Sequence, residues 1–236
     1  MKGKEAKKTQ QRVVGGPLGE SEKAAEKLAA LIGKHAMASK KVDAGGARLA
    51  LFCVDELAIA VEIGSGNKDK DGGTVVPTPA MLWRLHDDDG DSEPQPWTTV
   101  YTPPFVAQKI LGGANLMAPG VLGVLRQGGG EVPAGAPVAV CVPGNPRPFA
   151  TGLLASATTV PWVRGKDGEF GEGVAVHVVT CFGDGVWELA GRPIPNEGFR
   201  APTGGAAAHV IGIGAPVAGL GADEDEDDDD DDEDEI

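Results

Sequence analysis

The residues that could perform catalysis or bind a metal are scattered along the sequence. No two of the four histidines lie close together: they are His35, His86, His177 and His209. The sequence contains no GxxxxGKS or GxxxxGKT phosphate-binding loop, no HExxH zinc motif and no GxSxG nucleophile motif. The acidic stretch HDDDGDSEPQP, at 86–96, lacks the closing glutamate of a calcium-binding loop. These observations predict a protein that is not an enzyme and holds no metal or cofactor.

The cysteines favour a reducing compartment. Cys53, Cys141 and Cys181 are odd in number, far apart and without Cys-x-x-Cys spacing, and the start MKGKEAKKTQQRVVGG has no apolar signal core. No apolar run approaches the roughly twenty residues of a membrane span. We therefore expect a cytoplasmic protein with no membrane contact, in which the cysteines are small core residues.

Charge is concentrated at the two ends of the chain. Of the 35 acidic residues, thirteen lie in DEDEDDDDDDEDE, at 223–235, and the remaining 22 nearly balance the 21 Lys and Arg residues. Residues 1–41 carry ten Lys or Arg against four Glu. Both ends could simply be solvated. Alternatively, the asymmetry indicates contact of the N-terminal region with a polyanion, while the tail competes for that contact or binds basic proteins.

The first hundred residues show the pattern of a small α/β unit. Apolar residues at helical spacing predict an amphipathic helix from about Ser21 to Met37. Alternating apolar residues in ARLALFCVDELAIAVEIG, at 47–64, predict a hairpin that turns at Asp55-Glu56. An exposed loop at 64–73 and a short helical turn at 79–85 follow, and the acidic stretch at 86–96 is expected to be a solvated loop.

The next segment combines a short helix with a glycine-rich connection. TPPFVAQKIL predicts a helix capped by Thr102 and ended by Gly112-Gly113. In the following ANLMAPGVLG, we expect Leu116 and Met117 in the core and a turn at Pro119-Gly120. The apolar runs APVAVCV, RPFATGLLAS, GVAVHVVTCF and GVWELA then predict short strands of a compact barrel-like domain, and residues from Gly191 onward a linker.

Three of these segments resemble the signature of PUA domains. They are GGANLMAPGVLG, VPAGAPVAVCV and RPFATGLLAS. Together with PTPAMLWRL and VHVVTCFGDGVWELAGRPIP, they are similar to the N-terminal region of the family of eukaryotic translation initiation factor 2D (ligatin) and the malignant T-cell-amplified protein. The resemblance covers roughly residues 40–195.

The resemblance implies an α+β protein with four parts. Residues 1–18 would be a basic flexible arm, and 19–100 a pre-PUA-like α/β domain that includes the acidic loop. Residues 101–192 would be a PUA-type β pseudobarrel, and 193–236 a linker with a disordered acidic tail. Full-length members of the family continue into SWIB-like and SUI-type domains. We expect this chain either to act as the short members do, with a separate SUI-domain partner protein, or to be cut within its acidic linker.

The family binds structured RNA, so the resemblance implies docking on small-subunit ribosomal RNA and assistance in tRNA placement or recycling during initiation. Lys109, Arg126 and Arg147 would contact phosphates. Gly112, Gly113 and Gly120 would allow close backbone approach, and their amides would be donors. Asn115 and Pro119 would shape the turn. The alternative is that these glycines only connect a helix to a strand.

Three tryptophans have separate expected roles. Trp187 is expected in the core, Trp83 between the two domains, and Trp162, beside Arg164 and Lys166, in the core or stacked on an RNA base. Two other functions remain open at this point. The protein could be a PUA-containing accessory of RNA modification or ribosome biogenesis, or its acidic tail could be a chaperone of basic proteins.

Overall fold

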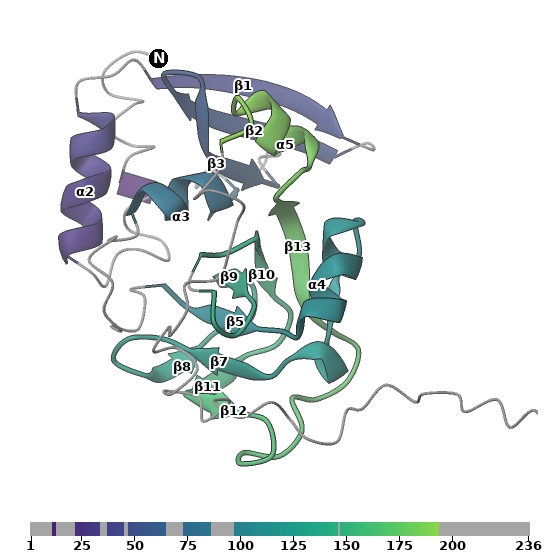
Figure 1. The fold of residues 1–236 in the computed structure, drawn as a ribbon. Coiled ribbons are helices and arrows are strands. Elements are labelled where there is room, and N and C mark those ends of the chain that lie inside the picture. Colours follow the sequence, from purple (N-terminus) through teal and green to yellow (C-terminus); the bar gives the residue numbers. More distant parts are fainter. Residues whose placement is uncertain are drawn as a thin grey trace, which may run out of the picture.

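The computed structural model describes residues 11–12, 22–33, 37–44, 47–64, 73–85, 97–145 and 147–193. The predictions for the acidic loop at 86–96 and for the acidic tail lie outside these residues, as do most of the predicted arm and most of the loop at 64–73. Figure 1 shows an N-terminal sheet flanked by helices above a barrel of short strands, with strand β13 running from the barrel toward the sheet. None of the described helices is long and apolar enough to cross a membrane.

The N-terminal unit is an antiparallel sheet packed against two helices. In chain order its elements are α2 (Glu22–Ile32), β1 (Met37–Ala44), β2 (Ala47–Val54), β3 (Leu57–Ile63), β4 (Thr74–Pro77) and α3 (Pro79–Leu85). The strand order is β1-β2-β3-β4. Leu28 of α2 and Met81 of α3 are fully buried with Ile59 of β3. The apolar faces of both helices therefore cover one side of the sheet.

The predicted hairpin is confirmed, and the predicted first helix is too long. Strands β2 and β3 pair up to Val54 and Leu57, and Asp55 and Glu56 have φ values of 46° and 70°. Such left-handed residues are those of a tight hairpin turn. Helix α2 ends at Ile32, and Met37, predicted to be helical, begins strand β1. The pairing of Met37–Ala44 with β2 outweighs the helical spacing of apolar residues that predicts a helix as far as Met37.

The second unit is the predicted barrel. Its elements are β5 (Thr99–Tyr101), α4 (Pro104–Leu111), β6 (Leu116–Met117), the 3-10 turn η1 (Ala118–Gly120), β7 (Gly123–Leu125), β8 (Gly130–Val132), β9 (Pro137–Cys141), β10 (Ala150–Leu154), β11 (Thr158–Val160), β12 (Trp162–Val163), β13 (Val174–Cys181) and α5 (Gly185–Leu189). One sheet has the order β12-β7-β5-β9-β10-β13-β6, and β11 pairs with β8. Its core includes Val100, Ile110, Leu116 and Val176.

The segment GVWELA is a helix, although its apolar run predicted a strand. Asp184 caps α5: its Oδ1 accepts from the Trp187 N–H at 2.8 Å, and its Oδ2 accepts from the Cys181 N–H at 2.8 Å. A capping aspartate that also holds the end of β13 favours a turn into a helix over a continued strand. Beyond α5, Ala190 is buried against Leu51 of the N-terminal sheet. Helix α5 thus lies against the other unit (Figure 1).

Buried hydrogen bonds join the two units. The Trp83 Nε1 of α3 donates to the Pro148 carbonyl at 2.7 Å, and the Thr151 hydroxyl of β10 donates to the Pro77 carbonyl at 2.7 Å. The rings of Trp83 and Phe182 lie 6.1 Å apart. The predicted position of Trp83 between the domains is confirmed. Because each donor has a directional partner across the junction, the two units have a defined relative placement.

One residue of the predicted arm is anchored to the sheet. Arg12 forms an ion pair with Glu62 of β3, with 2.7 Å between Nη2 and Oε1. The Glu62 carboxylate also accepts from the Gly73 N–H at 2.9 Å, and Arg12 donates to the Gly73 carbonyl. Glu62 is only 7% exposed, so its charge needs these partners.

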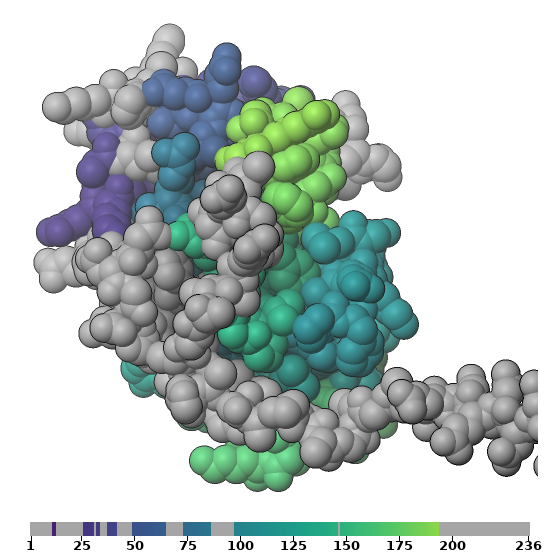
Figure 2. Space-filling model, viewed as in Figure 1, coloured from purple at the N-terminus to yellow at the C-terminus, as the bar shows by residue number. Residues whose placement is uncertain are grey.

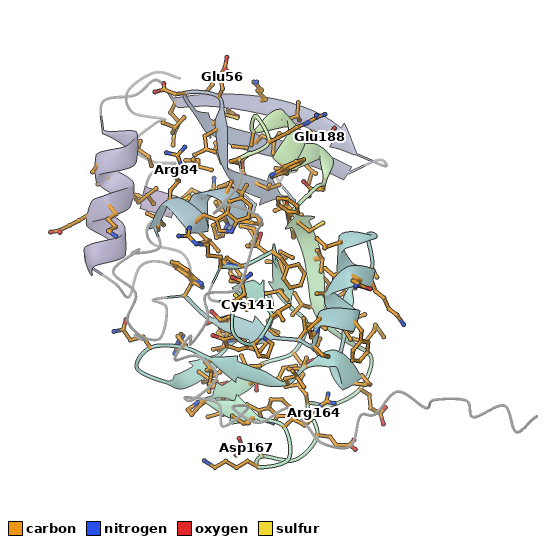
Figure 3. The ribbon with its side chains drawn as sticks, viewed as in Figure 1. Glu56, Arg84, Cys141, Arg164, Asp167 and Glu188 are labelled. Atoms are coloured by element: carbon orange, nitrogen blue, oxygen red, sulfur yellow. The ribbon has the colours of Figure 1, made fainter. Side chains whose placement is uncertain are left out.

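All three cysteines are buried and reduced, which confirms them as core residues. Cys141 lies inside the barrel (Figure 3), and burial raises the pKa of its thiol well above the ordinary value. Burial, with a smaller contribution from Asp184, raises the pKa of Cys181 to about 11. Thiols in such surroundings are unreactive near neutral pH.

Candidate nucleic-acid interface

Helix α4 is held on the outside of the barrel by one apolar side. Ala107 and Ile110 are buried, whereas Phe105, Gln108 and Lys109 are exposed. In the space-filling view the α4 region forms part of the outer surface below α5 (Figure 2). Since these exposed residues come from a packed helix, their positions are fixed by the barrel core.

Thr102 does not cap α4 as the sequence predicted. The residue at the N-cap is Pro103, which makes no side-chain cap hydrogen bond. The fully buried Thr102 hydroxyl donates instead to the Gly120 carbonyl at 2.8 Å. A buried carbonyl needs a donor, and here Thr102 satisfies it. The bond ties the start of α4 to the end of the glycine-rich segment, 112–120.

The first two glycines of this segment end the helix, as predicted. The Gly112 N–H donates to the carbonyls of Gln108 and Lys109, the Gly113 N–H donates to Ile110 at 2.9 Å, and the Ala114 N–H donates to Lys109 at 3.1 Å. Gly113 has a φ of 96°, which only glycine adopts without strain. These amides, expected as donors to RNA, are therefore already paired within the protein.

Gly120 has a packing role. It is buried, and a Cβ at this position would lie 2.9 Å from Cδ1 of Leu116 and 3.1 Å from Cγ1 of Val106. The absence of a side chain lets α4 lie close to η1. The structure thus places Gly120 beneath the helix and away from solvent, whereas Gly112, Gly113 and Pro119 are exposed.

Asn115 fixes the segment to the edge of β13. Its Oδ1 accepts a hydrogen bond from the Val178 N–H at 2.9 Å. This bond extends the pairing of β6 with β13, in which Leu116 lies opposite Val176. Its φ is not positive, so the expected role in an unusual turn does not apply. Since Oδ1 faces a backbone N–H, the Nδ2 group is the free end of the amide. Among the described residues it has no hydrogen-bond partner, and Asn115 is exposed.

Leu116 and Met117 differ in exposure. Leu116 is fully buried, as predicted, but Met117 is 47% exposed. They form strand β6, in which successive side chains point to opposite faces. The prediction that Met117 belongs to the core is therefore wrong.

The cations expected to contact phosphates lie on separate elements. Lys109 is exposed on α4 and has no acidic partner among the described residues. Arg126 follows the last residue of β7, and its backbone lies about 10 Å along the strand from that of Gly123, the first residue of β7. It is half-buried, and its Nε and Nη2 donate to the Gly129 carbonyl at 3.2 and 2.6 Å. Arg147 is half-buried in the loop between β9 and β10, beside the Trp83–Pro148 contact.

A different arginine lies at the glycine-rich segment. Arg164, which follows β12, donates through Nη2 to the carbonyls of Ala118 and Pro119. Figure 3 shows it at the lower end of the barrel. No local sequence pattern predicts this contact of Arg164 with the glycine-rich segment, because it depends on the pairing of β12 with β7. The structure therefore groups Lys109, Gly112, Gly113, Asn115, Pro119 and Arg164 along α4 and the segment after it.

Trp162 and Trp187 are packed against other aromatic rings. Trp162 is 7% exposed and meets Phe170 edge-on, with ring centroids 4.8 Å apart. It is a core residue and cannot stack on a base. Trp187 is half-buried, its ring lies 4.9 Å from that of Phe182, and its Nε1 donates to the Pro193 carbonyl at 2.8 Å.

Comparisons with known proteins agree with this fold. Residues 97–185 match the family model described as eIF2D, PUA domain. Eukaryotic translation initiation factor 2D of Oryctolagus cuniculus is 31% identical over 121 residues, which are 51% of this chain and 19% of that protein. The Rattus norvegicus protein is 30% identical over the same length. The match thus spans less than a fifth of the length of these relatives.

Two solved structures share the fold. A hypothetical protein of Pyrococcus horikoshii has a TM-score of 0.50 at 19% identity, covering 77% of this chain and 96% of that chain. A PUA domain of Aeropyrum pernix, in complex with tartrate, has a TM-score of 0.50 at 21% identity, covering 81% and 89%. With the α+β architecture, the barrel and the family match in agreement, residues 97–185 form a PUA-type barrel that matches the eIF2D PUA family, in a chain that resembles the N-terminal region of eukaryotic translation initiation factor 2D.

Proposed function

We propose that this protein is a non-enzymatic RNA-binding factor of translation, which docks on small-subunit ribosomal RNA in the cytoplasm and assists tRNA placement or recycling. The eIF2D-type PUA match over residues 97–185 is the observation that carries this proposal. The similarity to eukaryotic translation initiation factor 2D supports the link to translation.

The RNA-binding surface is the outer side of α4 with residues 112–119, called here the α4 face. Lys109, which has no acidic partner in the described part of the chain, supplies an ammonium group for a phosphate. Asn115 supplies an Nδ2 donor whose direction is set by the bond from Val178 to its Oδ1. Arg164 has five N–H donors, and its hydrogen bonds within the described part of the chain both come from Nη2, so its other nitrogens can serve a phosphate.

The shape of the α4 face also suits a backbone ligand. Gly112 and Gly113 are exposed, and a Cβ on Gly113 would point into open space. Without side chains, this corner can approach a sugar or phosphate closely. The amides of Gly112 and Gly113 are hydrogen-bonded to carbonyls at the end of α4, so these glycines give the ligand room to approach. The side chains of Lys109, Asn115 and Arg164 make the hydrogen bonds to the ligand.

Few cations serve this face, which predicts modest affinity from the chain alone. For single-stranded RNA, each phosphate contact contributes a slope of about −0.7 in the log of the binding constant against the log of salt. Two contacts, from Lys109 and Arg164, give a slope near −1.4. Further affinity would come from a separate SUI-domain partner bound on the same ribosomal subunit.

The proposal is tested by binding of the purified chain to small ribosomal subunits at low salt, measured by co-sedimentation. The double variant K109A/N115A should bind at least five-fold more weakly than the wild type. The matched control is K41A, which removes an exposed lysine from β1 in the other unit. If K41A weakens binding as much as K109A/N115A, or if the wild type does not bind, the proposal fails.

A further inference from the structure

Phe105 occupies the centre of the outer side of α4. At 100° per residue, the buried positions 107 and 110 lie on one side of the helix, and position 105 points almost directly away from them. The exposure of Phe105 agrees with this position, because the residue is 59% exposed. Gln108 and Lys109, three and four residues later, are its exposed neighbours on the helix surface.

No other aromatic ring in the described part of the chain is exposed. Tyr101, Phe149, Trp162 and the rings at 52, 83 and 97 are buried, and those at 170, 182 and 187 are half-buried. Helix propensity does not account for a phenylalanine at this exposed position, since phenylalanine is a weaker helix former than glutamine or lysine. The exposed ring is available to a ligand.

We propose that Phe105 is a stacking platform for an unpaired base of the RNA bound at the α4 face, with Lys109 contacting the adjoining phosphate. The inference rests on the proposed function and specifies its ligand as RNA with single-stranded nucleotides. A phenyl ring stacks on any base, because every base presents a π-face. The side chains of residues four apart begin about 6 Å from each other, so ring and ammonium can engage one nucleotide together.

The polar surroundings of the ring favour a nucleotide over a protein partner. Its neighbours on the helix are Gln108 and Lys109, and Lys is depleted from the cores of protein interfaces. The other exposed apolar residue of α4, Leu111, lies about 120° around the helix from Phe105. An exposed ring beside a lysine without an acidic partner among the described residues matches the combination of stacking and phosphate contact in single-strand binding sites.

The test compares two RNAs with the full chain. One is an eight-nucleotide oligoadenylate that carries a single 2-aminopurine, whose fluorescence reports stacking, and the other is a blunt twelve-base-pair duplex. The variants are F105L, which keeps an apolar side chain without the ring, and F105Y, which keeps the ring. Since the position is exposed, both should fold, and an unchanged urea midpoint verifies this.

F105L should weaken oligoadenylate binding roughly 5- to 30-fold, leave duplex binding unchanged and abolish the 2-aminopurine signal, whereas F105Y should retain all three. The salt slope should stay the same in F105L and become shallower by about 0.7 in K109A. If F105L binds oligoadenylate as the wild type does while K109A/N115A binds it weakly, the stacking inference is overturned and the proposed function stands. If the wild type binds neither RNA nor the ribosomal subunit, the proposed function fails as well.

Discussion

Replacing Gly120 by alanine tests whether the glycine-rich segment is built for packing beneath α4. The new methyl group would lie 2.9 Å from Leu116 Cδ1 and 3.1 Å from Val106 Cγ1, closer than carbon atoms normally approach. Leu116 is fully buried in the barrel core, so its Cδ1 has to shift against packed neighbours to make room. Overpacking of this kind costs about 1–3 kcal/mol. Gly120 does not have a positive φ, so alanine also stabilises by about 0.4–1 kcal/mol through the unfolded chain.

The expected net loss for G120A is about 1–2 kcal/mol in the free energy of unfolding. Urea unfolding followed by tryptophan fluorescence measures it. The matched control is the double variant G120A/V106A, in which the Val106 contact is gone. Its loss should be smaller than the sum of the two single losses by at least about 0.5 kcal/mol. Unfolding of G120A at the wild-type midpoint, or strict additivity in the double variant, would refute the close packing of α4 on Gly120.

Three further predictions follow from the interdomain junction, the buried thiols and the acidic tail. T151V removes the donor to the Pro77 carbonyl and should cost about 1–3 kcal/mol in urea unfolding; a change below about 0.5 kcal/mol would contradict a buried bond there. The raised pKa of Cys181 predicts that its contribution to stability is fully present below about pH 9 and is lost as the pH rises toward 11, because the unfolded thiol ionises first. In C181A, unfolding midpoints across this range should fall less steeply, and an identical fall would exclude Cys181 as the cause. Deletion of residues 223–236 should leave RNA affinity unchanged or raise it at low salt, whereas loss of binding in a filter assay would make the tail the binding element.

Local sequence patterns predicted those parts of the fold that depend on neighbouring residues. The hairpin at Asp55-Glu56 and the helix end at Gly112-Gly113 were found because a turn or a helix end is set by the dihedrals and hydrogen bonds of a few adjacent residues. The first helix was predicted too long, since β1 is defined by its pairing with β2. The helix α5 was missed, because the run GVWELA is apolar and the capping role of Asp184 was not recognised.

The sequence indicates part of the surface that the structure exposes. Lys109, Gly112, Gly113 and Asn115 are exposed on α4 and the segment after it, and their contact with RNA stays a prediction. Arg126 and Arg147 were selected only as nearby cations, and their half-buried positions lie on other loops. Phe105 lies in the segment TPPFVAQKIL, for which the sequence predicts a short helix, and only its exposure in the fold identifies it as a surface ring.

The sequence by itself determined the class of the protein: an α+β chain with a PUA-type barrel, because strand and turn patterns and the glycine-rich signature are local. The tertiary structure decided which residues face the proposed ligand. Arg164 reaches the Pro119 carbonyl across 45 positions of the chain, and Gly120 is buried under a helix that begins sixteen residues earlier. Such neighbours are brought together by strand pairing and core packing, which act between residues far apart in the sequence and leave no local pattern.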